Sequence, residues 1–114
     1  MLVEKTRYNL MELMVCVASR QLEDGRTAVI GTGMPLAAAM LAQKTTAPHL
    51  VVMFEAGSAA PELIKLPISV ADSYTQTRAL LHGSMDEIME ACQRGMVDYT
   101  FLGGAQIDMY GNIN

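Results

Sequence analysis

Aromatic residues are scarce in this sequence, which has no tryptophan and only two phenylalanines. Ten methionines are available to fill the core instead, and their flexible thioether side chains suit irregular packing. Charged residues amount to 18% and apolar residues to 51%, which is typical of a globular chain and not of a disordered one. At 114 residues the chain is long enough for one hydrophobic core, and we expect a single domain over residues 1–114.

Other absences exclude whole classes of protein. No apolar run reaches the length of a membrane span, and the N-terminus has no secretory signal pattern. The net charge of −4 comes without a basic stripe, which argues against a nucleic-acid partner. The two cysteines, Cys16 and Cys92, lie far apart in helical patterns and have neither metal nor redox spacing. We therefore expect reduced, buried thiols, no metal site and a cytoplasmic location.

The most informative stretch is the apolar run 50–54, which is rich in valine and lies between Pro48 and Gly57. Such a run predicts a fully buried strand, and buried strands of this kind are typical of parallel sheets. The run ends at Glu55. In open α/β sheets, ligands bind outside the carboxyl ends of the strands, so Glu55 is a candidate catalytic residue. The alternative is that Glu55 is merely the first solvated residue after the strand.

Hydrophobic periodicity predicts alternating elements in the rest of the chain: helices over 10–22, 36–42 and 85–94, and strands over 27–30 and 97–102. The segment 74–82 fits either a helix or a strand. The first helix is apolar on more than one side, so we expect it to be covered on two faces. The methionine stripe 85–89 is expected in the core. This order predicts an α/β fold, a three-layer sandwich with a mainly parallel sheet.

Three glycine-bearing junctions follow the predicted strands, namely 31–35, 55–58 and 103–108. Parallel strands would bring all three to one edge of the sheet. The first junction joins a strand to a helix through a Gly-x-Gly sequence, which allows close backbone approach and presents helix N–H groups to an anion. A plain tight turn is the alternative for that junction. Gln106 is a candidate for a polar contact in the cleft, whereas Asp72 and Asp108 are predicted to form turns and His49 and His82 to be ordinary edge or loop residues.

The same junctions carry a family resemblance. The motifs Gly31-Thr-Gly-Met-Pro35, Val51-Val-Met-Phe-Glu55-Ala-Gly57 and Gly103-Gly-Ala-Gln-Ile-Asp108 with Tyr110-Gly-Asn resemble the β subunit of class I CoA-transferases. The glutaconate CoA-transferase type is the most similar. The resemblance covers nearly the whole chain. It implies the α/β sandwich shared by CoA-transferases and certain sugar-phosphate isomerases.

The resemblance also implies a reaction. The glutamate of the family's Glu-x-Gly motif is the nucleophile, and here it is Glu55. Coenzyme A would be a substrate, carried as a glutamyl-CoA thioester between an acyl-CoA and a carboxylic acid, and no cofactor would be permanently bound. The loop with Gly31, Gly33 and Met34 would supply an N–H group for the oxyanion. The glycines Gly57, Gly103 and Gly104 would lie near CoA or the acyl chain.

Two features of the family set further expectations. Its β subunits are longer than this chain, so we expect 1–114 to correspond to the N-terminal part of such a subunit. They also work with an α-type subunit, which implies a hetero-oligomer that is active only when complete. Two other functions stay open at this point: a CoA-ester hydrolase or ring-cleaving relative on the same fold, and a non-catalytic domain that completes an oligomer. The acyl donor and acceptor are left unspecified.

Overall fold

The computed structural model describes residues 7–67, 69 and 72–114. The described helices are α1 (Leu10–Gln21), α2 (Met34–Lys44), the 3-10 helix η1 (Ser73–Gln76) and α3 (Met85–Gln93). The strands are β1 (Thr27–Val29), β2 (Val51–Met53), β3 (Ser58–Ala59), β4 (Leu81–His82) and β5 (Tyr99–Thr100). All the predicted helices and strands are confirmed, although the strands are shorter. The ambiguous segment 74–82 contains part of η1 and the whole of β4.

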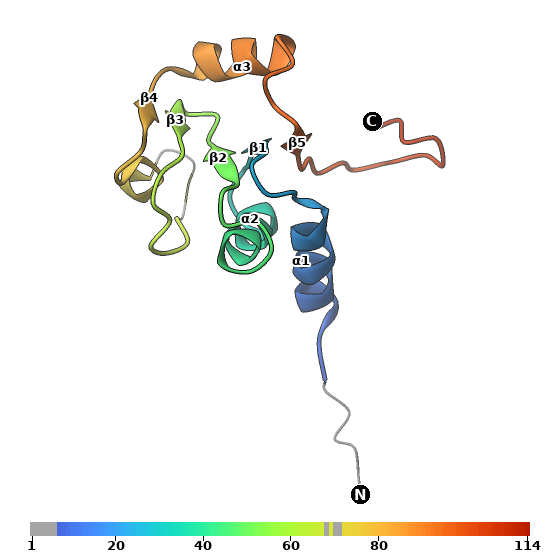
Figure 1. Cartoon of the computed structure of the whole chain (residues 1–114). Coiled ribbons are helices and arrows are strands. Elements are labelled where there is room, and N and C mark those ends of the chain that lie inside the picture. Colours follow the sequence, from blue (N-terminus) through green and yellow to red (C-terminus); the bar gives the residue numbers. More distant parts are fainter. Residues whose placement is uncertain (1–6, 68, 70–71) are drawn as a thin grey trace, which may run out of the picture.

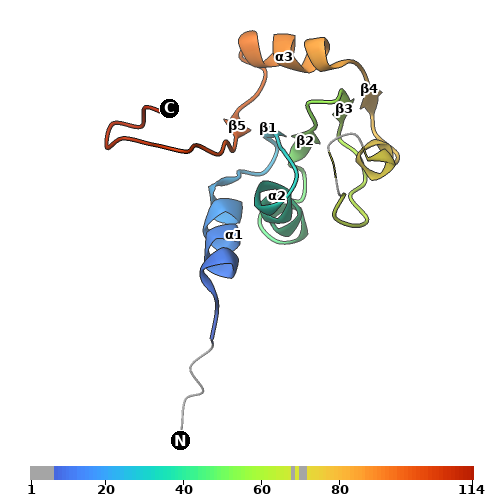
Figure 2. The same ribbon diagram turned by 180° about the vertical axis from the view of Figure 1, so that it is seen from behind.

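The strands form one sheet in the order β4-β3-β2-β1-β5. The three strands at one side, β2, β1 and β5, are parallel, whereas β3 and β4 pair in antiparallel fashion. Helices α1 and α2 lie on one face of the sheet and α3 lies on the other (Figure 1, Figure 2). The predicted α/β sandwich is therefore confirmed. Its antiparallel flank was not predicted, because β3 and β4 have only two residues each. No described helix is long and apolar enough to span a membrane.

The core lies between α2 and the sheet. Side chains in a strand alternate between faces, so Ala28 and Ile30, together with Val52 and Phe54, point to the same side. All four are buried, and so is Leu36 from α2. The alanines of α2, at positions 38, 39 and 42, are also buried and let the helix lie close to the sheet. This packing fixes the carboxyl ends of β1 and β2 relative to each other.

The outer faces of the other two long helices differ from the prediction. Among the residues of α3, Ile88 is buried, but Met85 and Met89 are 57% and 41% exposed, so the expected methionine core is wrong. The apolar face of α1 is likewise exposed. Both cysteines are unpaired, as predicted, but they are exposed and not buried. Periodicity identifies which face of a helix is apolar, but it does not say whether the same chain covers that face.

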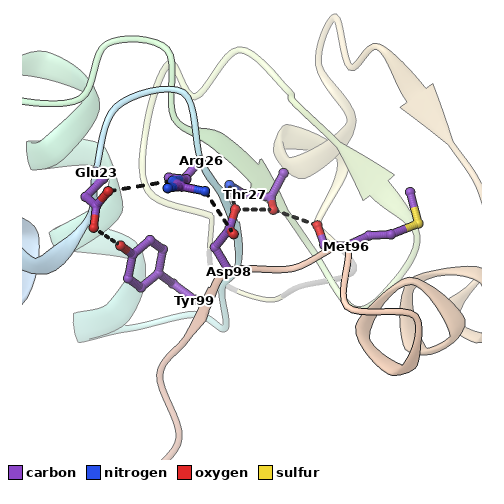
Figure 3. Close-up of polar contacts among 6 residues, drawn as sticks. All are labelled: Glu23, Arg26, Thr27, Met96, Asp98 and Tyr99. Atoms are coloured by element: carbon purple, nitrogen blue, oxygen red, sulfur yellow. Dashed lines mark hydrogen bonds and ion pairs between the residues drawn. The ribbon is translucent and has the colours of Figure 1, made fainter.

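A polar cluster fixes the short strand β5 against β1 (Figure 3). The Asp98 carboxylate accepts a hydrogen bond from the backbone N–H of Thr27 at 3.0 Å. The Thr27 hydroxyl donates to the carbonyl of Met96 at 2.7 Å and lies 3.0 Å from the same carboxylate. The Tyr99 hydroxyl donates to the carboxylate of Glu23, which lies between α1 and β1, at 2.6 Å. These contacts join segments about seventy residues apart at the amino ends of both strands, and they position the loop that follows β5.

We expect the Asp98 carboxylate to make stability depend on pH. The N–H and hydroxyl of Thr27, followed by the charge of Arg26, hold the pKa of Asp98 below its usual value. A lowered folded-state pKa gives stabilisation that is present above the unfolded pKa of about 3.9 and is lost as the pH falls through the folded pKa. In urea titrations, Asp98→Asn should unfold at lower urea than the wild type at neutral pH, and the gap should narrow below about pH 4.

Thr27→Val provides the matched control. It keeps the backbone N–H, which is the largest cause of the shift, and removes only the hydroxyl. This variant should retain most of the acid-dependent loss of stability. Parallel pH profiles for the wild type and Asp98→Asn would contradict the assignment.

Candidate active site

Glu55 lies in a tight turn directly after β2. Phe54 before it is buried in the core, and its N–H donates to the carbonyl of Ser58 at 2.9 Å. The N–H of Gly57 donates back to the carbonyl of Phe54 at 2.9 Å, which closes the turn. The side chain of Glu55 is exposed at the carboxyl end of β2. A buried anchor and a paired strand therefore hold an accessible carboxylate at the edge of the sheet.

Gly57 stabilises this turn through direct contact with Gly83. Its φ angle is +118°, and a Cβ atom at this position would overlap the backbone carbonyl of Gly83. The carbonyl of Gly57 accepts a hydrogen bond from the N–H of Gly83 at 2.8 Å. The need for glycine thus has a cause within the chain, and the position of Gly57 near CoA stays a prediction. This contact ties the Glu55 turn to the loop that begins α3.

Glu55 opens onto a groove between α3 and the sheet, which we call the α3 groove. Its volume is about 480 Å³, and its lining includes Gly31, Glu55, Met89, Cys92, Thr100 and Leu102. The walls are mostly apolar, so Glu55 lies at the rim of a hydrophobic space. Of the residues that sequence analysis placed in a site, Gly31 and Glu55 meet here. Met89 and Cys92 were assigned to the core instead, because an apolar helical stripe looks the same in both situations.

A second groove lies on the opposite face, between α1 and the segment after β5. This α1 groove has a volume of about 1050 Å³ and is lined by residues that include Leu13, Met14, Val17, Met34, Leu102 and Gly103. Phe101 and Leu102 line both grooves. The two predicted loop residues Met34 and Gly103 therefore meet in this groove. Gly33, at the start of α2, has a φ angle of +86°, which explains the glycine there.

The remaining predicted site residues lie on the arm 103–114, which extends away from the sheet (Figure 1). A Cβ atom on Gly104 would meet the side chain of Ile113, so this glycine faces its own arm. Gln106 accepts a hydrogen bond from the side-chain amide of Asn114 at 2.8 Å. Its proposed contact with a ligand stays a prediction. Asp108 accepts hydrogen bonds from the N–H groups of Tyr110 and Asn112, which confirms its role in a turn.

The other polar candidates have structural roles. Asp72 caps η1 by accepting a hydrogen bond from the N–H of Tyr74. His49 lies 3.0 Å from the carboxylate of Asp24, away from both grooves, and His82 lies in β4. Within the described ranges, no group of three or more His, Cys, Asp or Glu residues is arranged to hold a metal ion.

The family described as Coenzyme A transferase matches residues 11–114. The chain belongs to that family. It is 36% identical over 108 residues to the B subunit of 3-oxoadipate CoA-transferase from Pseudomonas knackmussii, an alignment that covers 94% of this chain and 42% of the relative. It is 30% identical to the B subunit of glutaconate CoA-transferase from Acidaminococcus fermentans, with 99% and 44% covered. The resemblance to CoA-transferase β subunits is thereby confirmed.

Solved structures agree with this membership. The crystal structure of the decarboxylase AibA/AibB superposes with a TM-score of 0.84 at 27% identity, covering 95% of this chain and 46% of that one. Glutaconate CoA-transferase from Acidaminococcus fermentans superposes with a TM-score of 0.75 at 29% identity, covering 97% and 45%. The chain thus spans less than half of the length of these relatives. The decarboxylase and the CoA-transferase both share the fold of this chain.

The Gly57–Gly83 contact predicts a large effect of Gly57→Ala. The alanine would have to adopt a strained positive φ angle, which costs about 1–3 kcal/mol, and would also displace the backbone of Gly83. Gly25→Ala is the matched control, since its φ angle is +73° and its surroundings are open, so only the strain of about 1 kcal/mol applies. Urea denaturation should show a clearly lower free energy of unfolding for Gly57→Ala than for Gly25→Ala. Equal losses would contradict the contact.

The exposure of both thiols gives a second prediction. Cys16 on α1 and Cys92 on α3 should react with a maleimide in the native protein, because both are exposed. Intact mass spectrometry should show two labels per chain without denaturant, and Cys16→Ser and Cys92→Ser should each show one. Labelling that requires denaturant would mean that the thiols are buried, as the sequence alone suggested.

Proposed function

We propose that this chain forms the β-type part of a CoA-transferase in which Glu55 is the nucleophile. The reaction would move CoA from an acyl-CoA to a carboxylic acid. The observation that carries this proposal is the position of Glu55 in a Glu-x-Gly turn, exposed at the carboxyl end of a buried parallel strand. Membership of the coenzyme A transferase family supports it.

The proposed reaction needs no external energy source. A carboxylate oxygen of Glu55 attacks the thioester carbonyl; a C–O bond forms, the C–S bond breaks, and CoA leaves as its thiolate. The thiolate then attacks the glutamyl carbonyl of the mixed anhydride and releases the first acid, which leaves a glutamyl-CoA thioester. An acceptor carboxylate attacks this thioester to give a second anhydride and the CoA thiolate. The thiolate attacks the new acyl carbonyl, so a new acyl-CoA leaves and Glu55 is regenerated.

The surroundings of Glu55 suit this chemistry. An anhydride is lost to hydrolysis if water reaches it, and the apolar walls of the α3 groove reduce the access of water on one side. The tetrahedral intermediates need N–H donors. Gly31 lines the same groove as Glu55, and the N-terminus of α2 follows it without a side-chain cap. We assign the oxyanion donors to this loop.

The assembly belongs to the proposal as well. The similar CoA-transferase chains are named as B subunits, and the decarboxylase AibA/AibB has a two-part name. We therefore propose an α-type partner chain that completes the CoA and acyl sites, within a cytoplasmic enzyme. Decarboxylation is a second candidate function, because the AibA/AibB superposition extends over 95% of this chain. Such a reaction would release CO₂ and would need no acceptor acid.

The decisive experiment is mass spectrometry of the chain together with its co-purified or added α-type partner. After incubation with a panel of acyl-CoAs, the peptide containing Glu55 should carry a CoA-sized adduct that a carboxylic acid releases. Glu55→Gln should abolish the adduct and lower the transfer rate by about 10³-fold or more, because the isosteric amide is not a nucleophile.

Glu90→Gln is the matched control, because Glu90 is an exposed acid on α3 that pairs with Arg94. This variant should form the adduct at the wild-type level. Free CoA without an adduct, at equal rates in the wild type and Glu55→Gln, would favour hydrolysis. Release of CO₂ without acid-dependent transfer would favour the decarboxylase function. Absence of all three reactions in the complete complex would favour a non-catalytic role.

A further inference from the structure

The peptide bond between Gly83 and Ser84 lies against the turn that carries Glu55. A Cβ atom on Gly57 would overlap the carbonyl group of Gly83 and would also meet the backbone nitrogen of Ser84. Gly57 therefore packs directly on this peptide bond. The N–H of Gly83 also donates to the carbonyl of Gly57 at 2.8 Å. Because of these two contacts, a shift of the Gly83–Ser84 peptide would move the Glu55 turn with it.

The carboxylate of Glu87 contacts the same peptide bond. It accepts a hydrogen bond from the backbone N–H of Ser84 at 2.7 Å, and the Ser84 hydroxyl donates to the same oxygen at 3.2 Å. A Cβ atom on Gly83 would overlap this carboxylate, so an alanine at position 83 would displace it. Ile88, the next residue of α3, is buried and anchors the helix from which Glu87 extends. The Gly83–Ser84 peptide is thus held by Glu87 as well as by Gly57.

We propose that Glu87 is a positioning residue for Glu55, which it reaches through the Gly83–Ser84 peptide and Gly57. The side chain of Glu55 is exposed, so the backbone contacts of its turn must keep the carboxylate aligned with the thioester carbonyl. Alignment matters for the rate, because a displacement of about 1 Å can cost about 10²-fold. This role rests on the proposed function of Glu55, whereas the link between Glu87 and the turn does not.

Helix α1 begins with the same type of cap but has no such link. The carboxylate of Glu12 accepts a hydrogen bond from the N–H of Asn9 at 3.0 Å, and the Asn9 side chain accepts one from the N–H of Glu12 at 2.8 Å. α1 lies on the opposite face of the sheet from α3 (Figure 1). If capping alone mattered, loss of Glu12 and loss of Glu87 would have the same consequences. A positioning role predicts a change at Glu55 for Glu87 only.

Hydrogen exchange tests the link in the complex of this chain with its α-type partner. Glu87→Ala should speed the exchange of the Gly57 and Gly83 amides by about tenfold or more, because a loosened Gly83–Ser84 peptide frees both. Neither amide donates to Glu87, so loss of the helix cap alone would expose only the amide of Ser84. Glu87→Gln should exchange like the wild type, because the side-chain carbonyl of glutamine accepts the same hydrogen bond. Glu12→Ala is the matched control and should leave the Gly57 and Gly83 amides unchanged.

The reactivity of Glu55 is measured in the same complex as the rate at which an acyl-CoA forms the CoA adduct. At saturating acyl-CoA, Glu87→Ala should lower this rate by about tenfold, while the half-saturating concentration changes by less than about twofold, because alignment and not binding is lost. Glu87→Gln and Glu12→Ala should keep the wild-type rate. Gly83→Ala should act like Glu87→Ala, and the double variant should be slower than either by less than about twofold, because both changes remove one contact.

The outcomes separate this role from the function proposed for Glu55. The positioning role is overturned if Glu87→Ala leaves the exchange of Gly57 and Gly83 or the adduct rate unchanged. It is also overturned if Glu12→Ala lowers the rate as much, or if Glu87→Gln behaves like Glu87→Ala. Absence of the adduct from the wild-type complex would instead reject Glu55 as the nucleophile. Faster exchange of Gly57 and Gly83 in Glu87→Ala would then still establish the link to the turn.

Discussion

The packing of the β1–β2 pair against α2 is the contact on which the rest of the structure depends. Ala28 and Val52 lie opposite each other in the parallel register and are both buried, as are the alanines of α2 that face them. Small residues on both sides let helix and sheet approach closely, and burial of apolar area contributes the main stabilisation. This packing places the ends of β1 and β2 side by side, and with them Gly31 and Glu55. The geometry of the candidate site therefore follows from the core.

The longest patterns were predicted well because their physical signals are local. The signal of the run 50–54 depends on neighbouring residues alone, and its strand is confirmed as β2, although Val51 and Met53 are half-buried and not fully buried. The pairs of residues that form β3 and β4 have no such signal. Their strand character comes from pairing with each other and, through the Gly57–Gly83 contact, from tertiary structure. A two-residue strand cannot be recognised before its partner is known.

The sequence predicts which strand ends meet at the candidate site, but it does not predict which residues form the walls of the groove. Parallel strands bring their carboxyl ends to one edge, so Glu55 and Gly31 could be associated from the sequence. Met89 and Cys92 form a groove wall because no described element covers that side of α3. An apolar stripe gives the same sequence signal whether it is packed or exposed. Gln106 accepts a hydrogen bond from the side chain of Asn114 within the arm, and its contact with a ligand stays a prediction.

The exposure of Glu55 connects the proposed mechanism with the proposed α-type partner. In the proposed mechanism the anhydride at Glu55 must be kept from water, yet Glu55 itself is exposed and its groove is open. The proposed α-type partner would therefore have to close this groove to keep water away from the anhydride. Assembly and protection of the intermediate would then be one event. A carboxylate nucleophile that becomes shielded only in the complete assembly would avoid the loss of acyl groups by an incomplete one.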